Sequence, residues 1–357
     1  MTFSFKRHKC VVVMPSFVLP LSINSSRASY TLRYKIGSGS TSEVFATDCG
    51  HAVKLVEFTA TSAEEYHILT NFNHPNLIHA FDHGITKIFC FQDDKQQQVA
   101  PVFYFYFVMR CSTTSMLSFS VRQSPFFLRI KYIKDIYRGL RFLINNHHIH
   151  GDIHPKNILM MQNGDCMLCD FNLSYSPLDV SVKFCETSTV PFCSPLSLIN
   201  NGYLLTDECK QQFDQCTTDQ KKQMVYQYKP GKTMMDIALN EKIDVRDQQK
   251  CDVFAFGQLM TYILFNEKSF CMGSDMSDAA GYISNLIEFC KQGEQMLYTY
   301  LNNCLHVYQI SESIQVYSST TSTSLNVSTL FNVLVGCLRL KQADRFFLHQ
   351  LDCILSW

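Results

Sequence analysis

The chain has 357 residues, of which 46% are hydrophobic and 17% charged, so it can build a large core and is not expected to be disordered throughout. Lysine plus arginine equals aspartate plus glutamate at 31 each, and this balance argues against a protein that coats nucleic acid or an anionic membrane. The length exceeds the usual single-domain size, so we expect two domains or one large bilobed unit.

The first 29 residues are expected to form an N-terminal extension that packs on the domain. Three basic residues precede an apolar run, as they do at the start of a secretory signal. Pro15 and Pro20 interrupt that run, however, and no clear small-residue cleavage site follows it. No apolar run reaches the roughly 18 residues that a membrane helix needs, so we expect no membrane partner.

The 16 cysteines have no repeating spacing in a chain of this length. The one CxxC pair, Cys166 with Cys169, lacks the second pair that would complete a zinc site. We therefore expect reduced, mostly buried thiols in a cytoplasmic or nuclear protein.

Short β-branched and aromatic runs between glycine and Asn/Asp turns predict strands over residues 30–109. One helix is expected to interrupt these strands at Ser62–Phe72. Its apolar residues Tyr66, Leu69 and Phe72 recur at a spacing that places them on one helical face.

The rest of the chain has a mainly helical pattern. Ile130–Asn145 is an amphipathic candidate, and the almost wholly apolar Cys251–Phe265 predicts a buried central helix. The Gln-rich Asp93–Gln98 and the Ser/Thr-only run Ser318–Ser324 are expected to be loops, and the polar segment Asn200–Gln249 is interpreted as an insert. Strands followed by helices indicate an α+β protein of two lobes.

A glycine-containing turn, Ile36-Gly-Ser-Gly-Ser-Thr-Ser-Glu-Val44, separates two strand-like segments. Its glycines let backbone N–H groups approach phosphates. Lys54 closes an apolar strand ten residues after Val44 and can reach the same phosphates, while Glu65 on the expected helix can hold Lys54 in position. Taken singly, the turn is more often an ordinary loop, and Glu65 more often a solvated helix carboxylate.

The strongest pattern is His150-Gly-Asp-Ile-His-Pro-Lys-Asn157, followed by Cys169-Asp-Phe-Asn172. Asp152 and Asn157 fall on one short loop, and Asp170 comes 13 residues after Asn157, past a strand-like segment. Oxygen ligands from Asn157 and Asp170 suit a hard divalent ion that bridges phosphates. The carboxylate of Asp152 suits a base that accepts the hydroxyl proton of a phosphate acceptor.

In these motifs the chain resembles the eukaryotic protein kinase family, over almost the whole of residues 30–357. The resemblance includes His74-Pro-Asn76 and Asp252-Val-Phe-Ala-Phe-Gly257, which is similar to the family's central-helix signature. It implies a bilobed α+β fold. A small β-rich lobe with one helix would occupy residues 30–111, and a larger helical lobe residues 112–357.

The resemblance also implies a role for each candidate residue. Lys54 would pair with Glu65, and Asp152 would be the catalytic base. Asn157 and Asp170 would hold Mg²⁺, with ATP as the phosphate donor. The nucleotide-binding positions implied are Ile36, Gly37, Ser38, Gly39, Val44, Ala52, Lys54, Met109, Cys111 and Leu159.

The chain departs from the family pattern at several positions. Ser42 takes the place of the third glycine of the turn, and Gly151 takes the place of the catalytic-loop arginine. Because that arginine would receive an activation-loop phosphate, we expect activity without such phosphorylation. Asn172 replaces a glycine, and asparagine tolerates a left-handed backbone. Leu196 replaces the glutamate of Ala-Pro-Glu, which predicts that Arg345 lacks its usual partner and that the substrate-binding region is less rigid.

The most informative departure is His154, where Ser/Thr protein kinases usually have a lysine two residues after Asp152. This loop is similar to that of small-molecule phosphotransferases of the aminoglycoside and choline kinase type. Those enzymes lack the stretch Thr187–Pro195 and the central-helix signature. Thr189 lies where Ser/Thr kinases keep a threonine that contacts the catalytic loop. Both His154 and Thr189 are therefore candidate catalytic residues.

We favour an ATP-dependent protein kinase that transfers the γ-phosphate to Ser/Thr hydroxyls of a protein substrate and binds no nucleic acid. One alternative is a pseudokinase scaffold, which the departures at Gly151, Asn172 and Leu196 motivate. The other is a small-molecule phosphotransferase. All five polar positions of the catalytic set are intact, and a scaffold would have no need to keep them.

Overall fold

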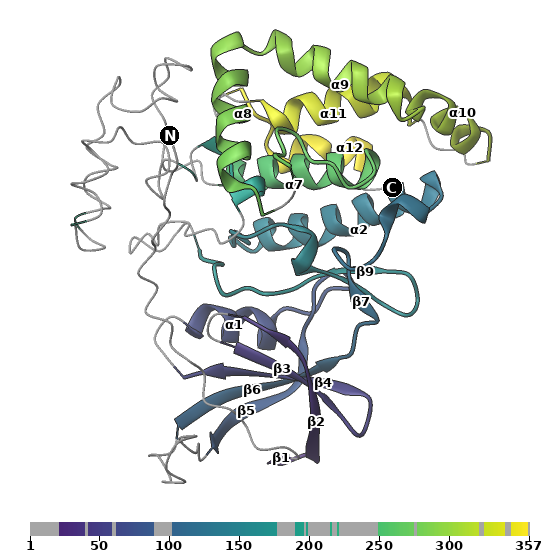
Figure 1. Ribbon diagram of the computed structural model, residues 1–357. Coiled ribbons are helices and arrows are strands. Elements are labelled where there is room, and N and C mark those ends of the chain that lie inside the picture. Colours follow the sequence, from purple (N-terminus) through teal and green to yellow (C-terminus); the bar gives the residue numbers. More distant parts are fainter. Residues whose placement is uncertain are drawn as a thin grey trace. The chain divides into compact units, whose positions relative to one another are not determined.

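The computed structural model describes residues 21–39, 42–58, 62–88, 102–176, 190–195, 249–274, 277–320, 325–339 and 344–355, with single positions 198, 215 and 220 (Figure 1). The chain divides into two compact units after residue 111, except that residues 74–77 belong to the second unit. The first unit is rich in strands and the second is mainly helical. This is the α+β composition that the sequence predicts.

The β-rich unit contains a six-stranded antiparallel sheet with the strand order β1-β2-β3-β4-β6-β5 (Figure 1). In β4, Val53 and Leu55 join a buried cluster on one face, whereas Lys54 faces the opposite way, toward α1. The elements are β1 (Leu21–Asn24), β2 (Ser29–Ser38), β3 (Ser42–Thr47), β4 (His51–Glu57), α1 (Ala63–Asn71), β5 (Ala80–Ile88) and β6 (Val102–Arg110).

The first strand belongs to the segment that the sequence assigns to an N-terminal extension. β1 pairs with β2, and its Ile23 is buried in the sheet's core cluster. The hairpin is fastened to β5, because Ser25 Oγ and Tyr30 OH donate to Asp82 Oδ2 at 2.6 and 2.7 Å. Burial, together with Asp82, raises the pKa of Tyr30 to about 12, so the phenol keeps its proton. Residues 21–24 are thus an integral part of the sheet.

The helix α1 ends one residue before the predicted limit, and its buried face differs from the prediction. Glu65, Ile68 and Leu69 are buried, whereas Tyr66 and Phe72 are half-buried. The apolar pattern alone misplaced this face, because Glu65 is drawn into the interior by the cation of Lys54.

The helical unit contains a small three-stranded sheet, β7-β8-β9, and a set of packed helices. The central helix α7 (Gln249–Leu264) is buried along nearly its whole length and contacts α2 and α11. Its position confirms the predicted central helix. The remaining elements are β7 (Thr114–Ser115), α2 (Phe126–Asn145), β8 (Ile158–Met160), β9 (Cys166–Leu168), α8 (Ala279–Gln292), α9 (Gln295–Val307), α10 (Ile310–Thr320), α11 (Val327–Leu338) and α12 (Asp352–Leu355).

The Ser/Thr run is not a loop throughout. Its first three residues are the last residues of α10, where Ser319 and Thr320 hydroxyls bond carbonyls one turn back. Such bonds satisfy the hydroxyls inside a helix, which is why composition alone gave the wrong prediction there. Residues 321–324 lie outside the described ranges, as do Asp93–Gln98 and most of the Asn200–Gln249 segment. Within the helices that the structure describes, none has the length and hydropathy that a membrane crossing requires.

Candidate active site

A buried ion pair links β4 to α1. Lys54 Nζ donates to Glu65 Oε1 at 2.5 Å, and the two side chains are only 8% and 1% exposed. The backbone of Lys54 is held between β3 and β6 in the sheet. Because a buried charge that loses its partner is costly, each ion keeps the other in place.

The turn between β2 and β3 carries the glycines. Gly39 N donates to Ser42 O at 2.8 Å and closes the turn. A Cβ at position 39 would lie 2.8 Å from Ser42 Oγ, so glycine allows this close approach. Ile36, Gly37 and Ser38 belong to β2, with Gly37 opposite Val44 of β3. Residues 40 and 41 lie outside the described ranges.

The strand register places four candidate residues on one face of the sheet. Val44 pairs with Lys54, and Ala52 pairs with Met109 of β6. Ala52 and Lys54 are two positions apart in β4, so their side chains share a face. Cys111 follows β6 and is half-buried, and this burial raises the pKa of its thiol. An apolar face that ends in a lysine suits a nucleotide base and its phosphates.

The start of the catalytic loop is fixed by α7. Asp252 accepts from His150 N at 2.7 Å and from Gly151 N at 3.0 Å. Burial raises the pKa of Asp252 to about 6, although the two N–H groups stabilise its charged form. Burial lowers the pKa of His150 to about 4, so this imidazole is neutral at neutral pH. Its Nδ1 accepts from Asp152 N at 3.3 Å, so the proton lies on Nε2, which donates to Cys169 O at 3.2 Å.

Two donors orient the carboxylate of Asp152. His154 Nε2 and Asn157 Nδ2 each lie 3.2 Å from Asp152 Oδ2. The backbone decides which nitrogen of His154 carries the proton. Lys156 N donates to Nδ1 at 3.2 Å, so the neutral ring has its proton on Nε2 and donates it to Asp152. The Asp152 side chain is 10% exposed, which leaves it reachable from solvent while both donors hold it.

The β8–β9 hairpin brings the two candidate metal ligands to the same end. Ile158 pairs with Leu168, so Asn157 and Asp170 flank one end of the hairpin, and Cys169 N donates to Asn157 O at 3.0 Å. Asn157 Nδ2 is engaged by Asp152, which leaves the amide oxygen as the atom for a cation. An amide oxygen and a carboxylate fit Mg²⁺, whose coordination is commonly completed by phosphates and water.

Asp170 has a φ of +65°, in the left-handed region that non-glycine residues rarely adopt. The residues around it impose this conformation, because Cys169 is bonded through both its N–H and its carbonyl. Strained backbone of this kind is concentrated at functional sites. The candidate Leu159 lies on β8, half-buried, opposite Ser115 and Met167.

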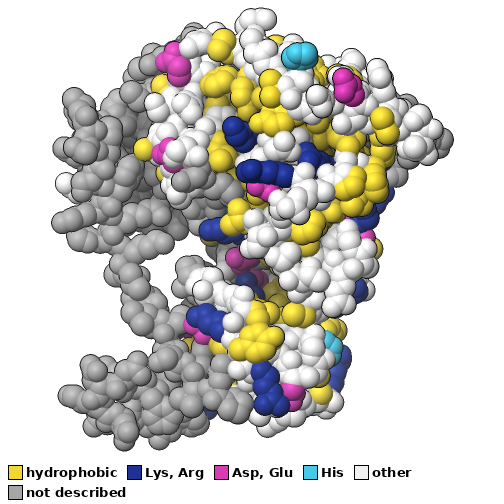
Figure 2. Space-filling view, turned by 45° about the vertical axis from the view of Figure 1, so that its right-hand side comes forward, with side chains coloured by type: hydrophobic (Ala, Val, Ile, Leu, Met, Phe, Trp, Pro, Cys, Tyr) yellow, Lys and Arg dark blue, Asp and Glu magenta, His cyan; other side chains and the backbone are white. Residues whose placement is uncertain are grey.

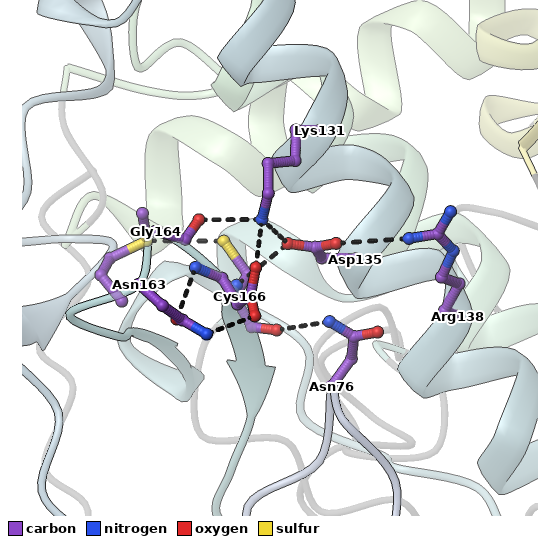
Figure 3. A network of polar contacts seen from close by, with 9 residues as sticks. Asn76, Lys131, Asp135, Arg138, Asn163, Gly164 and Cys166 are labelled. Carbon is purple, nitrogen blue, oxygen red and sulfur yellow. Dashed lines mark hydrogen bonds and ion pairs between the residues drawn. The ribbon is translucent and has the colours of Figure 1, made fainter. Parts of the chain in front are cut away.

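A polar network beneath the hairpin positions β9 (Figure 3). Asp135 of α2 accepts from Cys166 N at 3.1 Å, and Asn76 Nδ2 donates to Cys166 O at 3.0 Å. Lys131 joins Asp135 to Asp165, with distances of 2.7 and 2.6 Å (Figure 3). The strand that leads to Asp170 is therefore held at both backbone groups of one residue.

The family model described as the protein kinase domain matches residues 30–206 of the chain. The chain belongs to the eukaryotic protein kinase family.

Curated relatives agree over parts of the chain. The mitogen-activated protein kinase kinase MKK2 of Pyricularia oryzae is 48% identical over 80 residues, which is 22% of this chain and 15% of that protein. The MAP kinase kinase MKK1/SSP32 of Saccharomyces cerevisiae is 33% identical over 78 residues, again 22% and 15%. The serine/threonine-protein kinase fray1 of Dictyostelium discoideum is 26% identical over 163 residues, or 42% of this chain and 26% of that protein. The matches thus span about a quarter or less of these relatives' length.

The structure explains why a glycine, Gly151, takes the place of the catalytic-loop arginine. Gly151 has a φ of +80°, and a Cβ there would lie 2.6 Å from Leu173 O. Ser174 Oγ donates to His150 O, and Ile149 and Tyr175 exchange backbone bonds, so residues 173–175 pack directly on the loop. Hydrogen bonds therefore join residues 149–150 of the catalytic loop to residues 174–175.

The expectation for Asn172 was wrong in its location. The left-handed backbone of the metal motif is at Asp170, and Asn172 is not among the described residues with positive φ. The left-handed residue therefore precedes the asparagine, so the replacement of glycine by Asn172 causes no backbone strain there.

The chain also holds Arg345 in a way that the sequence did not predict. Its guanidinium donates to Arg339 O at 3.0 and 2.9 Å and to Lys250 O at 2.9 Å, and it lies 4.9 Å from the centre of the Phe254 ring. Backbone carbonyls and an aromatic face therefore receive this buried cation. Leu196 and the candidate Thr189 lie outside the described ranges.

Sequence reasoning missed the residues that support the site from below. Lys131 and Asp135 are spaced i, i+4 on a predicted helix, a signal that was present in the sequence. The bond of Asp135 to β9 joins residues 31 positions apart and had no local signal.

Proposed function

We propose that this kinase transfers the γ-phosphate of ATP to Ser/Thr hydroxyls of protein substrates. The observation that carries the proposal is the carboxylate of Asp152, which His154 and Asn157 orient through two donors on one oxygen. A fixed carboxylate that solvent can still reach is what a phosphate acceptor's hydroxyl requires of its base.

In this mechanism each unit supplies part of the chemistry. Lys54, held by Glu65, binds phosphate oxygens and stabilises the charge that develops on them. The glycine-containing turn between β2 and β3 lets the backbone approach the phosphates without side-chain obstruction. The face formed by Val44, Ala52 and Met109 receives the base of the nucleotide.

The helical unit supplies the groups for the acceptor and the metal. Asp152 orients the hydroxyl and takes its proton as the hydroxyl oxygen attacks the γ-phosphorus and the bond from that phosphorus to the bridging oxygen breaks, releasing ADP. Asn157 and Asp170 would hold Mg²⁺, which when bound neutralises the charge of the phosphates. His154 keeps its Nε2 proton throughout and maintains the plane of the Asp152 carboxylate.

The pseudokinase alternative is disfavoured by the engagement of all five polar positions. Lys54 and Glu65 are paired, Asp152 is oriented, and Asn157 and Asp170 share the end of one hairpin. The small-molecule phosphotransferase alternative rests on the similarity of the loop around His154 to that of such enzymes. In this chain, His154 donates to Asp152. Nine cysteines of the described part of the chain have free thiols, and a cytoplasmic or nuclear location is part of the proposal.

An acceptor survey separates the three functions. Purified protein is incubated with radiolabelled ATP and Mg²⁺ in the presence of a basic protein, an aminoglycoside or choline, and the labelled residues are identified. We expect label on Ser and Thr of the protein acceptor. Label on the small molecules alone would replace this proposal with the phosphotransferase, and ATP binding without any transfer would replace it with the scaffold.

A further inference from the structure

The segment Val190–Pro195 is buried although Cys193 and Ser194, between the short turn Val190–Phe192 and the helical Pro195, belong to no helix or strand. Phe192, Cys193 and Ser194 are each at most 3% exposed. The sequence places this segment in the substrate-binding region and predicts that it is poorly fixed, because Leu196 replaces a carboxylate. A specific support must therefore keep the segment in the interior.

The support comes from α8. Tyr282 OH donates to Cys193 O at 2.7 Å, and Gln258 Nε2 of α7 donates to the same phenol oxygen at 3.1 Å. Tyr282 and Gln258 are completely buried, so neither water nor another conformer replaces these bonds cheaply. The phenol has one proton, and Gln258 supplies the other bond, so the direction of both bonds is determined.

The segment also contacts the catalytic loop. The ring of Phe192 lies 6.4 Å from that of His154, whose Nε2 donates to Asp152. The Arg345 guanidinium, by contrast, donates to the carbonyls of Arg339 and Lys250. A continuous set of contacts therefore runs from α7 and α8 through Cys193 and Phe192 to the catalytic loop.

We propose that Tyr282 is a positioning residue for the protein acceptor. It holds Cys193 O and so fixes the segment against which the acceptor binds, in place of the missing carboxylate at position 196. Its hydroxyl bonds Gln258 and Cys193, neither of which is a candidate nucleotide-binding or metal-ligating residue, so we expect its effect on acceptor binding. This inference rests on the proposed protein kinase function.

Steady-state kinetics of Tyr282→Phe test the role. The matched control is Tyr262→Phe, which removes the hydroxyl of a tyrosine 2% exposed on α7, one turn from Gln258 and outside this set of contacts. We expect the KM for a protein acceptor to rise about tenfold in Tyr282→Phe. The KM for ATP and the slow hydrolysis of ATP without acceptor should stay within about twofold of wild type. An unchanged acceptor KM, or the same rise in both variants, would overturn the proposal.

Hydrogen–deuterium exchange tests the anchoring without requiring activity. Peptides that cover residues 190–195 should exchange about tenfold faster in Tyr282→Phe than in wild type or Tyr262→Phe, with peptides from α7 unchanged. Equal exchange in all three proteins would overturn the anchoring even if acceptor phosphorylation is never observed. Faster exchange in a protein that transfers no phosphate would leave the anchor in place and reject only the protein kinase function.

Discussion

At the scale of single residues, the most informative difference from the family pattern is His154, where Ser/Thr protein kinases usually have a lysine. Its ring is almost fully buried, and the N–H of Lys156 fixes the proton on the nitrogen that faces Asp152. The residue thus serves as a neutral donor to the base, where a lysine would serve as a cation for phosphate. Its identity was evident from the sequence, but its tautomer and direction were not.

Substitution of His154 tests this donor role. His154→Gln keeps an N–H donor of similar reach, whereas His154→Leu removes it. We expect the leucine variant to lose about 10- to 100-fold in kcat, because the carboxylate is no longer oriented, and the glutamine variant to keep most of the rate. The KM for ATP should not change in either. Equal loss in the two variants would show that the hydrogen bond is not what matters.

Position 151 requires a glycine, because its backbone has a positive φ and no space is left for a Cβ. Gly151→Ala places a Cβ 2.6 Å from Leu173 O in a backbone at φ +80°. The control Gly164→Ala has φ +79° with no atom within 4 Å of its Cβ. We expect the control to lose about 1 kcal/mol of unfolding free energy from the backbone alone and Gly151→Ala to lose at least about 2 kcal/mol more. Urea denaturation of both variants measures this, and equal losses would contradict it.

The buried imidazole of His150 makes a definite contribution to the pH dependence of stability. Its folded pKa of about 4 lies below the ordinary value of 6.5, so the unfolded chain takes up the proton first as pH falls. The stabilisation is therefore present above pH 6.5 and lost toward pH 4. Asp252, with its raised pKa of about 6, has the opposite slope in nearly the same range.

Comparison of wild type with His150→Gln isolates the histidine, because the opposing contribution of Asp252 is present in both proteins and largely cancels in the difference. We expect the stability advantage of wild type to fall by about 2 kcal/mol between pH 7 and pH 5. Urea unfolding at the two pH values measures it. A difference that does not change with pH would show that His150 titrates alike in the folded and unfolded protein.

At the scale of elements, α2 and α7 were predictable from sequence because their apolar patterns are long. β1 was not, because four residues carry too little pattern, and its place depends on Asp82 of a distant strand. The end of α10 was missed because hydroxyl side chains bond within the helix there. The candidate site motifs were recognisable, but the supports from Asp135 and Tyr282 join segments far apart in the chain and leave no local pattern.

The network under β9 provides an element-level test. Asp135 is buried and bonds both Lys131 and the backbone of β9, whereas Asp165, the other partner of Lys131, is 38% exposed. We expect Asp135→Ala to cost about 3 kcal/mol of unfolding free energy. Asp165→Ala should cost less than about 1 kcal/mol.

The two variants should differ in function as well. Loosening of β9 displaces Asp170, so Asp135→Ala should need more Mg²⁺ for half-maximal transfer, measured below its unfolding temperature. If Asp165→Ala raised the Mg²⁺ requirement as much as Asp135→Ala, the support would not run through β9.

At the scale of the whole molecule, the equal numbers of acidic and basic residues are reflected in the mixed charges on the surface. In the view of Figure 2, lysine and arginine side chains of the described residues are scattered among acidic and uncharged ones. Specific cations therefore matter more than a general field, and the burial of Lys54 and its pairing with Glu65 favour a role with phosphate.

The proposed catalytic groups are divided between the two units of the chain. The β-rich unit contains Lys54 and Glu65, and the helical unit contains Asp152, Asn157 and Asp170. Each set is held by contacts within its own unit. Loss of either set should stop transfer, but only loss of Asp152 should do so without weakening the binding of ATP.

The most direct test of the central claim is therefore the rate of phosphate transfer by Asp152→Asn at saturating ATP and Mg²⁺, with ATP affinity measured on the same sample. We expect transfer to fall by about 10²- to 10⁴-fold with ATP affinity unchanged. Transfer by Asp152→Asn at the wild-type rate would contradict the assignment of Asp152 as the base and with it the proposed mechanism.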